Sequence, residues 1–197
     1  MKKLYLIRHG ISQHNILFKN FGTKIFYDKR YYDTKLTGQG IEQSLHLGNT
    51  WKDKHFIDCV FCSSLTRTLE TANNIFKDNL DIPIYALDIL KEFPQGLHTC
   101  NKRSNIDQLK KEFPRINFSL IQDNEDIMWD DTKEEPLEKL NDRIFDFKEF
   151  IKNRPEKNIA MIGHNSFIGQ MMNNHIPLIE NGDEELKHCY PYEYKLF

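Results

Sequence analysis

The sequence predicts an α/β fold, a three-layer α/β/α sandwich with a mostly parallel central sheet. Three short apolar runs, at 4–7, 58–62 and 159–162, are typical of strands that are buried on both faces. Segments with helical spacing follow them, so strand and helix alternate along the chain. Such alternation favours parallel strands joined by right-handed crossovers. We expect the 197 residues to form one domain, 1–197.

Capping residues and hydrophobic spacing place the elements of the first half. Ser12 and Thr37 are expected N-caps, because their side-chain oxygens accept from the first turn of a helix. Pro83 confines its strand to a sheet edge, since proline has no N–H to donate. The expected elements are, in order, a strand at 4–7, a helix from Ser12 to Phe18, an irregular aromatic stretch at 20–34, a helix from Thr37 to Trp51, a strand at 58–62, a helix ending near Phe76 and an edge strand at 82–85.

The second half is placed by the same signals. An acid three residues after Ser104 has the character of a capping box. Apolar residues spaced from Leu137 to Ile151 form one helical face. The expected elements are, in order, a helix from Ser104 to Phe113, an irregular acidic segment at 122–135, a helix at 136–153, a strand at 159–162, a helix at 165–174 and a final strand at 192–197. The direction of the final strand is left open.

Composition and charge exclude several classes of function. With 27 basic and 29 acidic residues the net charge is -2, so no general positive field attracts nucleic acid or an anionic membrane. The chain starts directly with a short strand, and no apolar run has the length of a membrane span. We therefore expect a soluble, cytoplasmic protein with neither nucleic acid nor membrane as partner.

The four cysteines are expected to be reduced thiols. Cys59 and Cys62 have the Cys-x-x-Cys spacing of some redox and zinc sites. In a strand, however, residues three apart point to opposite faces, and no second Cys/His pair completes a zinc site. Two buried thiols are therefore expected here.

Polar side chains follow three of the expected strands where each strand ends. Arg8 and His9 come after the first strand, Ser63 and then Arg67 after the second, and His164 after the strand at 159–162. In an open α/β sheet, ligands bind outside the carboxyl ends of the strands. Two arginines hold a dianionic phosphate through charged, forked hydrogen bonds, and a helix N-terminus adds backbone N–H groups. The sequence therefore predicts a phosphate site.

A histidine in such a site is suited to attack phosphorus, because neutral imidazole is present at physiological pH. Release of an alcohol oxygen also needs a proton donor, and Glu92, just after the third strand, is the candidate. No aspartate cluster or phosphate-loop lysine indicates a magnesium-dependent route. We expect chemistry without a metal or a cofactor.

Several motifs in the same order resemble those of the histidine phosphatase superfamily, also called phosphoglycerate mutase-like. The matching residues are Arg8-His9-Gly10 with Ser12 and Asn15, Leu36-Thr37 with Gly40 and Gln43, Ser63-Ser64 with Arg67-Thr68 and Thr71-Ala72, Glu92, and Gly163-His164. Ile11 departs from the glutamate that is common after the glycine. The stretches at 96–104, 118–121 and 125–129 are similar to a plant and protist branch of the family.

The resemblance implies the phosphoglycerate mutase-like fold and a phosphohistidine mechanism. His9 would be the nucleophile and Glu92 the proton donor that later activates water. The catalytic set implied is Arg8, His9, Arg67, Glu92 and His164. The set implied to contact the substrate is Arg8, Asn15, Arg67, His164, Asn165, Asn101 and Arg103, of which Asn101 and Arg103 would face its second end.

Three functions remain open at this point. A metal-independent phosphatase acting on a small phosphorylated molecule or a phosphoprotein agrees best with the residues. A cofactor-dependent phosphoglycerate mutase uses the same pocket, but such mutases are longer and carry Glu-Arg-His-Tyr-Gly where this chain has Glu92-Phe-Pro-Gln-Gly96. A non-catalytic phospholigand-binding domain would need no nucleophile. Substrate selectivity is expected in the loops at 20–34 and 94–131.

The other six histidines have no spacing that makes a metal site. Each is expected to be a surface or packing residue. They are His14, His46, His55, His98, His175 and His188. The acidic run at 123–131 lacks the alternating ligands and central glycine of a calcium loop and is expected to be a solvated loop or lid.

Overall fold

The computed structural model describes residues 2–177 and 186–196. Its central sheet has the strand order β3-β2-β4-β1-β5. The strands are β1 (Lys3–Arg8), β2 (Cys59–Ser63), β3 (Ile84–Leu87), β4 (Asn158–Gly163) and β5 (Pro191–Lys195). β1 and β4, β2 and β4, and β2 and β3 pair in parallel, whereas β5 pairs antiparallel with β1. The expected mostly parallel sheet is confirmed, and β3 lies at its edge as Pro83 predicted.

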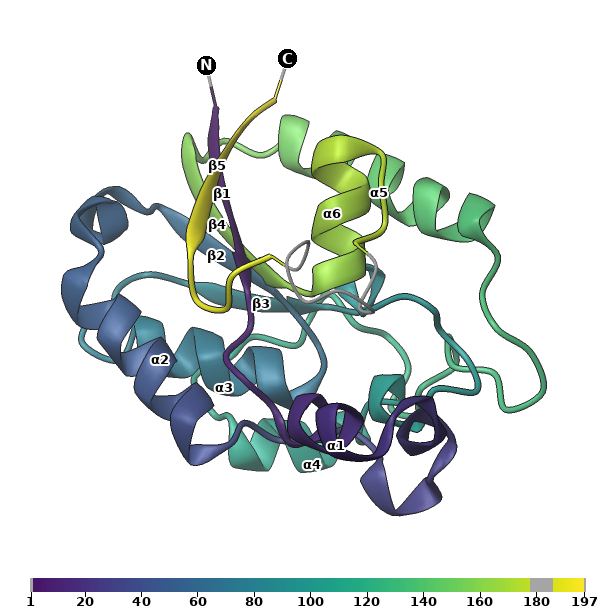
Figure 1. Cartoon of the computed structure of the whole chain (residues 1–197). Helices are drawn as coiled ribbons and strands as arrows, with labels where there is room; N and C mark the ends of the chain where they lie inside the picture. The colour runs from purple at the N-terminus through teal and green to yellow at the C-terminus, as the bar shows by residue number, and fades with distance from the viewer. Residues whose placement is uncertain (1, 178–185, 197) are drawn as a thin grey trace.

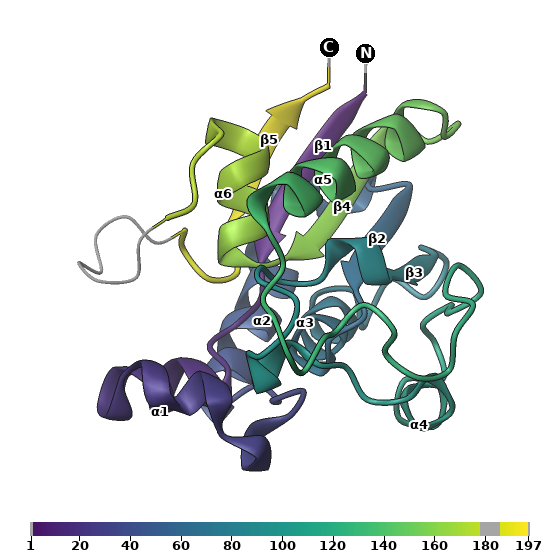
Figure 2. The same cartoon turned by 90° about the vertical axis from the view of Figure 1, so that its right-hand side faces the viewer.

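Helices cover both faces of this sheet. They are α1 (Gln13–Phe21), α2 (Gly38–Thr50), α3 (Thr66–Ile75), α4 (Ile106–Glu112), α5 (Leu137–Lys152) and α6 (Asn165–Asn173). α2 and α3 lie on one face and α5 and α6 on the other, while α1 and α4 lie beyond the end at which β1 finishes (Figures 1 and 2). The three-layer sandwich is therefore confirmed. No helix in the described ranges has the length and apolar character needed to cross a membrane.

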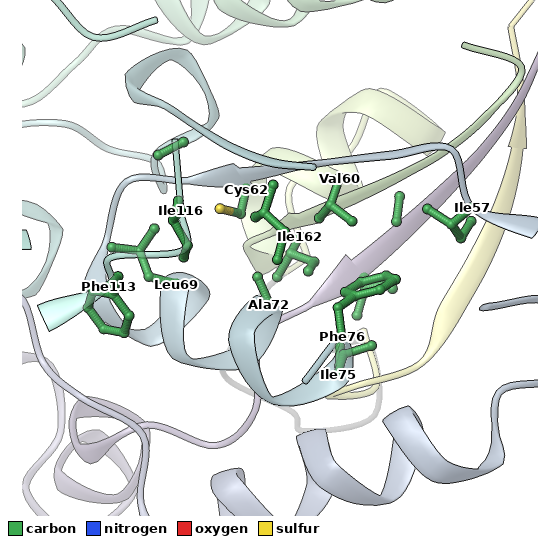
Figure 3. Close-up of a cluster of buried hydrophobic side chains, with 14 of the residues drawn as sticks. Ile57, Val60, Cys62, Leu69, Ala72, Ile75, Phe76, Phe113, Ile116 and Ile162 are labelled. Carbon is green, nitrogen blue, oxygen red and sulfur yellow. The ribbon is translucent and has the colours of Figure 1, made fainter. Parts of the chain in front are cut away.

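Two apolar cores fill the spaces between these layers. The core beneath α2 and α3 contains Val60, Cys62, Leu69 and Ile162 (Figure 3). The core beneath α5 and α6 contains Cys59. The two thiols thus point to opposite faces of β2, as predicted, and both are free. Burial raises the pKa of the Cys59 thiol to about 12, which keeps it protonated.

Some boundaries differ from the sequence prediction. α1 continues past Phe18 to Phe21. α4 is capped by Asn105, whose side chain accepts from the Gln108 N–H, and the expected cap Ser104 lies one residue earlier. An asparagine side chain is a full equivalent of serine in this position, so two adjacent cap residues compete. The final strand runs antiparallel to β1 and places the two ends of the described chain side by side.

Candidate active site

The carboxyl ends of β1, β2 and β4 bring the predicted residues together. The rings of His9 and His164 lie 5.2 Å apart between centroids. Arg67, the second residue of α3, donates from its Nε to His9 Nε2 at 3.3 Å. All three side chains are almost completely buried. The juxtaposition expected from the parallel sheet is therefore present, and Arg8, His9, Arg67, Glu92 and His164 are called the phosphate centre below.

The environment of His9 fixes its tautomer. His9 Nδ1 lies 2.7 Å from the carbonyl oxygen of Gly10. A carbonyl oxygen only accepts, so Nδ1 carries the proton and Nε2 keeps its lone pair. Burial and the nearby Arg67 guanidinium hold the pKa of His9 well below its usual range. Near neutral pH His9 is thus a neutral imidazole, and its Nε2 accepts a hydrogen bond from Arg67 Nε.

The backbone after β1 is held by close contact with α2. A Cβ atom on Gly10 would lie 2.4 Å from the carbonyl oxygen of Gly40, and one on Gly40 would lie 2.1 Å from that of Ile11. Gln43 Oε1 accepts from the Ile11 N–H at 2.9 Å. Gly10 therefore serves a close approach to a helix. The motif at 36–43 supports the turn that carries His9 and does not itself line the pocket.

Asn101 belongs to the same site through Arg67. Arg67 Nη1 donates to the carbonyl of Cys100 at 2.7 Å, and Nη2 donates to Asn101 Oδ1 at 3.0 Å. The other end of the amide, Asn101 Nδ2, donates to the Pro94 carbonyl at 2.9 Å. Asn101 also lines the pocket. Asn101 therefore orients the arginine that faces His9.

Two buried nitrogen atoms beside His9 lack a hydrogen-bond partner in the part of the chain that the structure describes: His164 Nδ1 and Asn165 Nδ2. Their side chains are held at the opposite atoms, since His164 Nε2 lies 2.8 Å from Ser63 Oγ and Asn165 Oδ1 accepts from the Leu186 N–H at 3.0 Å. Arg8 Nη1 donates to the carbonyl of Leu186 at 2.8 Å. Asn165 Nδ2 is a donor that a phosphate oxygen would satisfy, and His164 Nδ1 is a second donor in the tautomer whose Nε2 accepts from the Ser63 hydroxyl.

Glu92 lies at the N-terminus of α6. Its Oε1 accepts from the Phe93 N–H at 2.8 Å, and Ser166 and Phe167 donate their N–H groups to its carboxylate at 3.3 Å. The sequence predicts that this helix N-terminus binds phosphate, but two of its N–H groups bind the Glu92 carboxylate instead. Burial raises the pKa of Glu92, while the N–H groups and Arg67 act in the opposite sense. A raised pKa suits a carboxyl that gives and takes protons.

Of the residues predicted to contact substrate, Asn15 lies in the pocket and Arg103 lies outside it. Asn15 lines the pocket, and its Oδ1 accepts from the Ser12 N–H at 3.0 Å, which closes the first turn of α1. Arg103 lies outside the pocket. Its Nε donates to Asp88 at 2.9 Å, and its Nη2 donates to the carbonyls of Asp123 and Glu125. The expected contact of Arg103 with substrate is therefore corrected: its guanidinium is engaged in holding the acidic segment.

Three histidines near the site were expected to be surface or packing residues. His14 lines the pocket with its ring 6.0 Å from that of His9. His188 Nδ1 donates to the His9 carbonyl at 2.5 Å. His98 lines the pocket and stacks on Phe26. The sequence indicates a site position only for His14, which follows the end of the first strand by a few residues. His98 and His188 lie far from that strand in the sequence, and only the fold brings them near His9.

The pocket above His9 has a volume of about 320 Å³. Its lining includes Arg8, His9 and Glu92 of the phosphate centre. Its lining also includes Phe18, Phe26 and His98, whose rings form a continuous stack and are called the aromatic wall below. Among the described residues no group of His, Cys, Asp and Glu side chains is arranged to hold a metal ion.

The fold and this constellation define a class of protein. Residues 4–187 match the family described as the histidine phosphatase superfamily (branch 1), and the chain belongs to it. Two relatives from Arabidopsis thaliana are similar to the chain. "Phosphoglycerate mutase-like protein 1" is 30% identical over 204 residues, covering 87% of this chain and 71% of that protein. "Phosphoglycerate mutase-like protein" is 25% identical over 203 residues, covering 88% and 74%.

Solved structures show the same fold. The α-ribazole phosphatase from Shigella flexneri has a TM-score of 0.60 at 23% identity and covers 95% of this chain and 87% of its own. The ecdysone phosphate phosphatase from Bombix mori, in complex with tungstate, has a TM-score of 0.62 at 16% identity and covers 98% and 88%. The expected family and fold are thus confirmed.

Proposed function

We propose that this chain is a metal-independent phosphatase that hydrolyses a phosphomonoester through a phosphohistidine on His9. The observation that carries the proposal is the geometry of His9, whose Nδ1 donates to the Gly10 carbonyl at 2.7 Å and whose Nε2 lone pair accepts from Arg67 Nε at 3.3 Å. Membership of the histidine phosphatase superfamily supports the same reaction. The concave pocket favours a small phosphorylated molecule as substrate.

The residues supply both steps of this reaction. In the first, His9 Nε2 attacks phosphorus, the bond from phosphorus to the alcohol oxygen breaks, and Glu92 gives its proton to that oxygen. In the second, the Glu92 carboxylate takes a proton from water, the water oxygen attacks phosphorus, and the phosphorus–nitrogen bond breaks to release inorganic phosphate. Arg8 and Arg67 offset the charge on the phosphoryl group throughout.

The test is hydrolysis of p-nitrophenyl phosphate in the presence of a chelator. His9→Ala should lower kcat by roughly 10⁴-fold or more, as expected when a covalent nucleophile is removed. His55→Ala, which changes an exposed histidine outside the pocket, is the control and should retain activity. Equal rates for wild type and His9→Ala would refute the mechanism. Loss of wild-type activity in chelator would refute its independence of metals.

A phosphoglycerate mutase is the second candidate, because the similar plant proteins carry mutase-like names. The two functions differ in the acceptor of the phosphoryl group, which is water in one and substrate in the other. Assay of 3-phosphoglycerate with and without 2,3-bisphosphoglycerate separates them. Isomerisation that depends on the bisphosphate would replace the phosphatase proposal. Binding of phosphate esters with no turnover would indicate a phospholigand-binding domain.

The proposal includes a cytoplasmic location. It is supported by the four free cysteines, of which Cys59, Cys62 and Cys100 are buried, since free thiols persist in a reducing compartment. Cell fractionation tests it, and recovery in a secreted or organellar fraction would contradict it.

A further inference from the structure

We infer that the pocket takes a phosphomonoester whose alcohol part is apolar and uncharged, such as an aryl or arylalkyl group, in preference to one that carries a second anionic group. This inference rests on the proposed function and adds the substrate class. Its basis is the aromatic wall, the charges that line the pocket, and the contacts that hold the wall in place.

The aromatic wall is an ordered stack. The rings of Phe18 and Phe26 have centroids 5.1 Å apart and planes 14° apart. The rings of Phe26 and His98 have centroids 4.7 Å apart and planes 17° apart. Further apolar lining comes from Phe93, Pro94, Ile176 and Pro177. Contact with these groups removes apolar surface of a ligand from water, which favours binding roughly in proportion to area.

The pocket lining has few charges. Among the described residues that line it, Arg8 is the sole arginine or lysine and Glu92 the sole carboxylic acid. The lining histidines add no positive charge near neutral pH, because burial lowers the pKa values of His9, His14 and His98.

This charge distribution matches one phosphate. Arg8 and Arg67 of the phosphate centre serve the reacting group, and no described cation lines the pocket beside the aromatic wall. A carboxylate or second phosphate on the alcohol part would lose hydration there without gaining a charged partner. The pocket therefore discriminates against phosphoglycerate and bisphosphoglycerate, while an apolar ring gains contact area.

The wall is held by contacts outside the pocket. Trp129 Nε1 donates to the His98 carbonyl at 3.0 Å, and His98 Nε2 lies 3.3 Å from Glu134. Thr99 Oγ1 donates to the Asp28 carbonyl at 2.9 Å and so joins the segment that carries His98 to the one that carries Phe26. A surface fixed from behind in this way is ready for a ligand before binding, which reduces the entropy cost of association.

The experiment compares benzyl phosphate, glycerol 3-phosphate and 3-phosphoglycerate, which are all alkyl esters with similar chemical demands at the leaving oxygen. We expect kcat/KM for benzyl phosphate to exceed the other two by at least about tenfold, given the apolar area of one ring. A higher kcat/KM for 3-phosphoglycerate, or for a phosphoserine peptide, would overturn the inference and leave the phosphatase intact. No turnover of any ester would instead defeat the proposed function.

Two variants test the wall itself. Phe26→Ala should lower kcat/KM for benzyl phosphate about tenfold and change that for glycerol 3-phosphate less than threefold. Phe145→Ala, at an exposed phenylalanine on α5, is the matched control and should change neither.

Thr23→Lys adds a cation at an exposed position on the pocket rim without removing core packing. It should raise the ratio of kcat/KM for 3-phosphoglycerate to kcat/KM for benzyl phosphate severalfold; an unchanged ratio would contradict the charge argument.

Discussion

The phosphate centre and the aromatic wall are adjacent but are built in different ways. Residues of the phosphate centre stand directly at the ends of strands or within a few residues of them, so the sheet positions them. Wall residues stand on loops and a short helix that are positioned by hydrogen bonds from other loops and by one buried ion pair. The chemistry of the site therefore depends on the sheet, whereas its selectivity depends on how the loops are anchored.

The anchor of the acidic loop is a buried ion pair. Lys91 Nζ lies 2.5 Å from Asp126, and both side chains are fully buried. Asp126 also accepts from the backbone N–H groups of Arg103 and Met128. The segment expected to be a solvated loop or lid is therefore tied to the body of the protein at Asp126, and it carries Trp129 and Glu134 to the back of His98.

The largest expected effect tests the phosphate centre. Glu92→Gln removes the proton donor and should lower kcat for benzyl phosphate by roughly 10²- to 10⁴-fold. p-Nitrophenyl phosphate has a good leaving group and should lose much less activity. Steady-state kinetics with both esters measure the difference. A uniform loss would show that Glu92 holds α6 in place and does not act as the acid.

The next effect tests the anchor. Lys91→Met leaves the Asp126 carboxylate buried without its partner and should lower the free energy of unfolding by about 3–5 kcal/mol. Urea denaturation measures this loss. The double variant Lys91→Met/Asp126→Leu should recover most of it, because no charge then remains buried. Lys139→Met, in the exposed pair with Asp142, is the control and should have little effect.

Acid should destabilise the folded state through His188, which lies beside His9. Burial lowers the pKa of His188 to about 3, so the folded state holds it neutral while the unfolded chain protonates it below pH 6.5. Unfolding then takes up a proton, and the free energy of unfolding falls as pH decreases, by about 1.4 kcal/mol per pH unit for this histidine. His188→Gln should reduce that slope between pH 6 and 4. His55→Gln, at an exposed position, should leave the slope unchanged.

The smallest effect sharpens the role of the wall. Trp129→Phe keeps an aromatic ring but removes the hydrogen bond to the His98 carbonyl, which is worth about 1 kcal/mol. We expect KM for benzyl phosphate to rise about fivefold and kcat to stay within twofold. An equal fall in kcat would mean that the loop also positions the phosphate centre.

The sequence sufficed for the phosphate centre because each residue follows a strand signal closely. Arg8, His9 and His164 adjoin apolar runs, and parallel strands end at one edge of the sheet. The sequence alone does not distinguish the role of Asn101 from that of Arg103. They are two residues apart in one loop, yet one orients Arg67 and the other binds Asp88 and the acidic segment.

Long-range contacts explain the other differences between the sequence predictions and the structure. His188 reaches His9 from a segment 179 residues later in the chain, and no local pattern marks that pairing. The direction of β5 likewise depends on how the chain returns to β1. The helix N-terminus of α6 was expected to bind phosphate, but Glu92, more than 70 residues earlier, occupies its N–H groups. Such partners become visible only once the fold is known.

The hydrogen bond from His9 Nδ1 to the Gly10 carbonyl also determines which phosphoenzyme isomer forms. With Nδ1 protonated, phosphorylation is directed to Nε2, which gives the tele isomer of phosphohistidine, and the carbonyl dipole then faces the positive charge of the ring. The regiochemistry of the intermediate is therefore set by a main-chain atom, whose position depends on the close approach of Gly10 to Gly40.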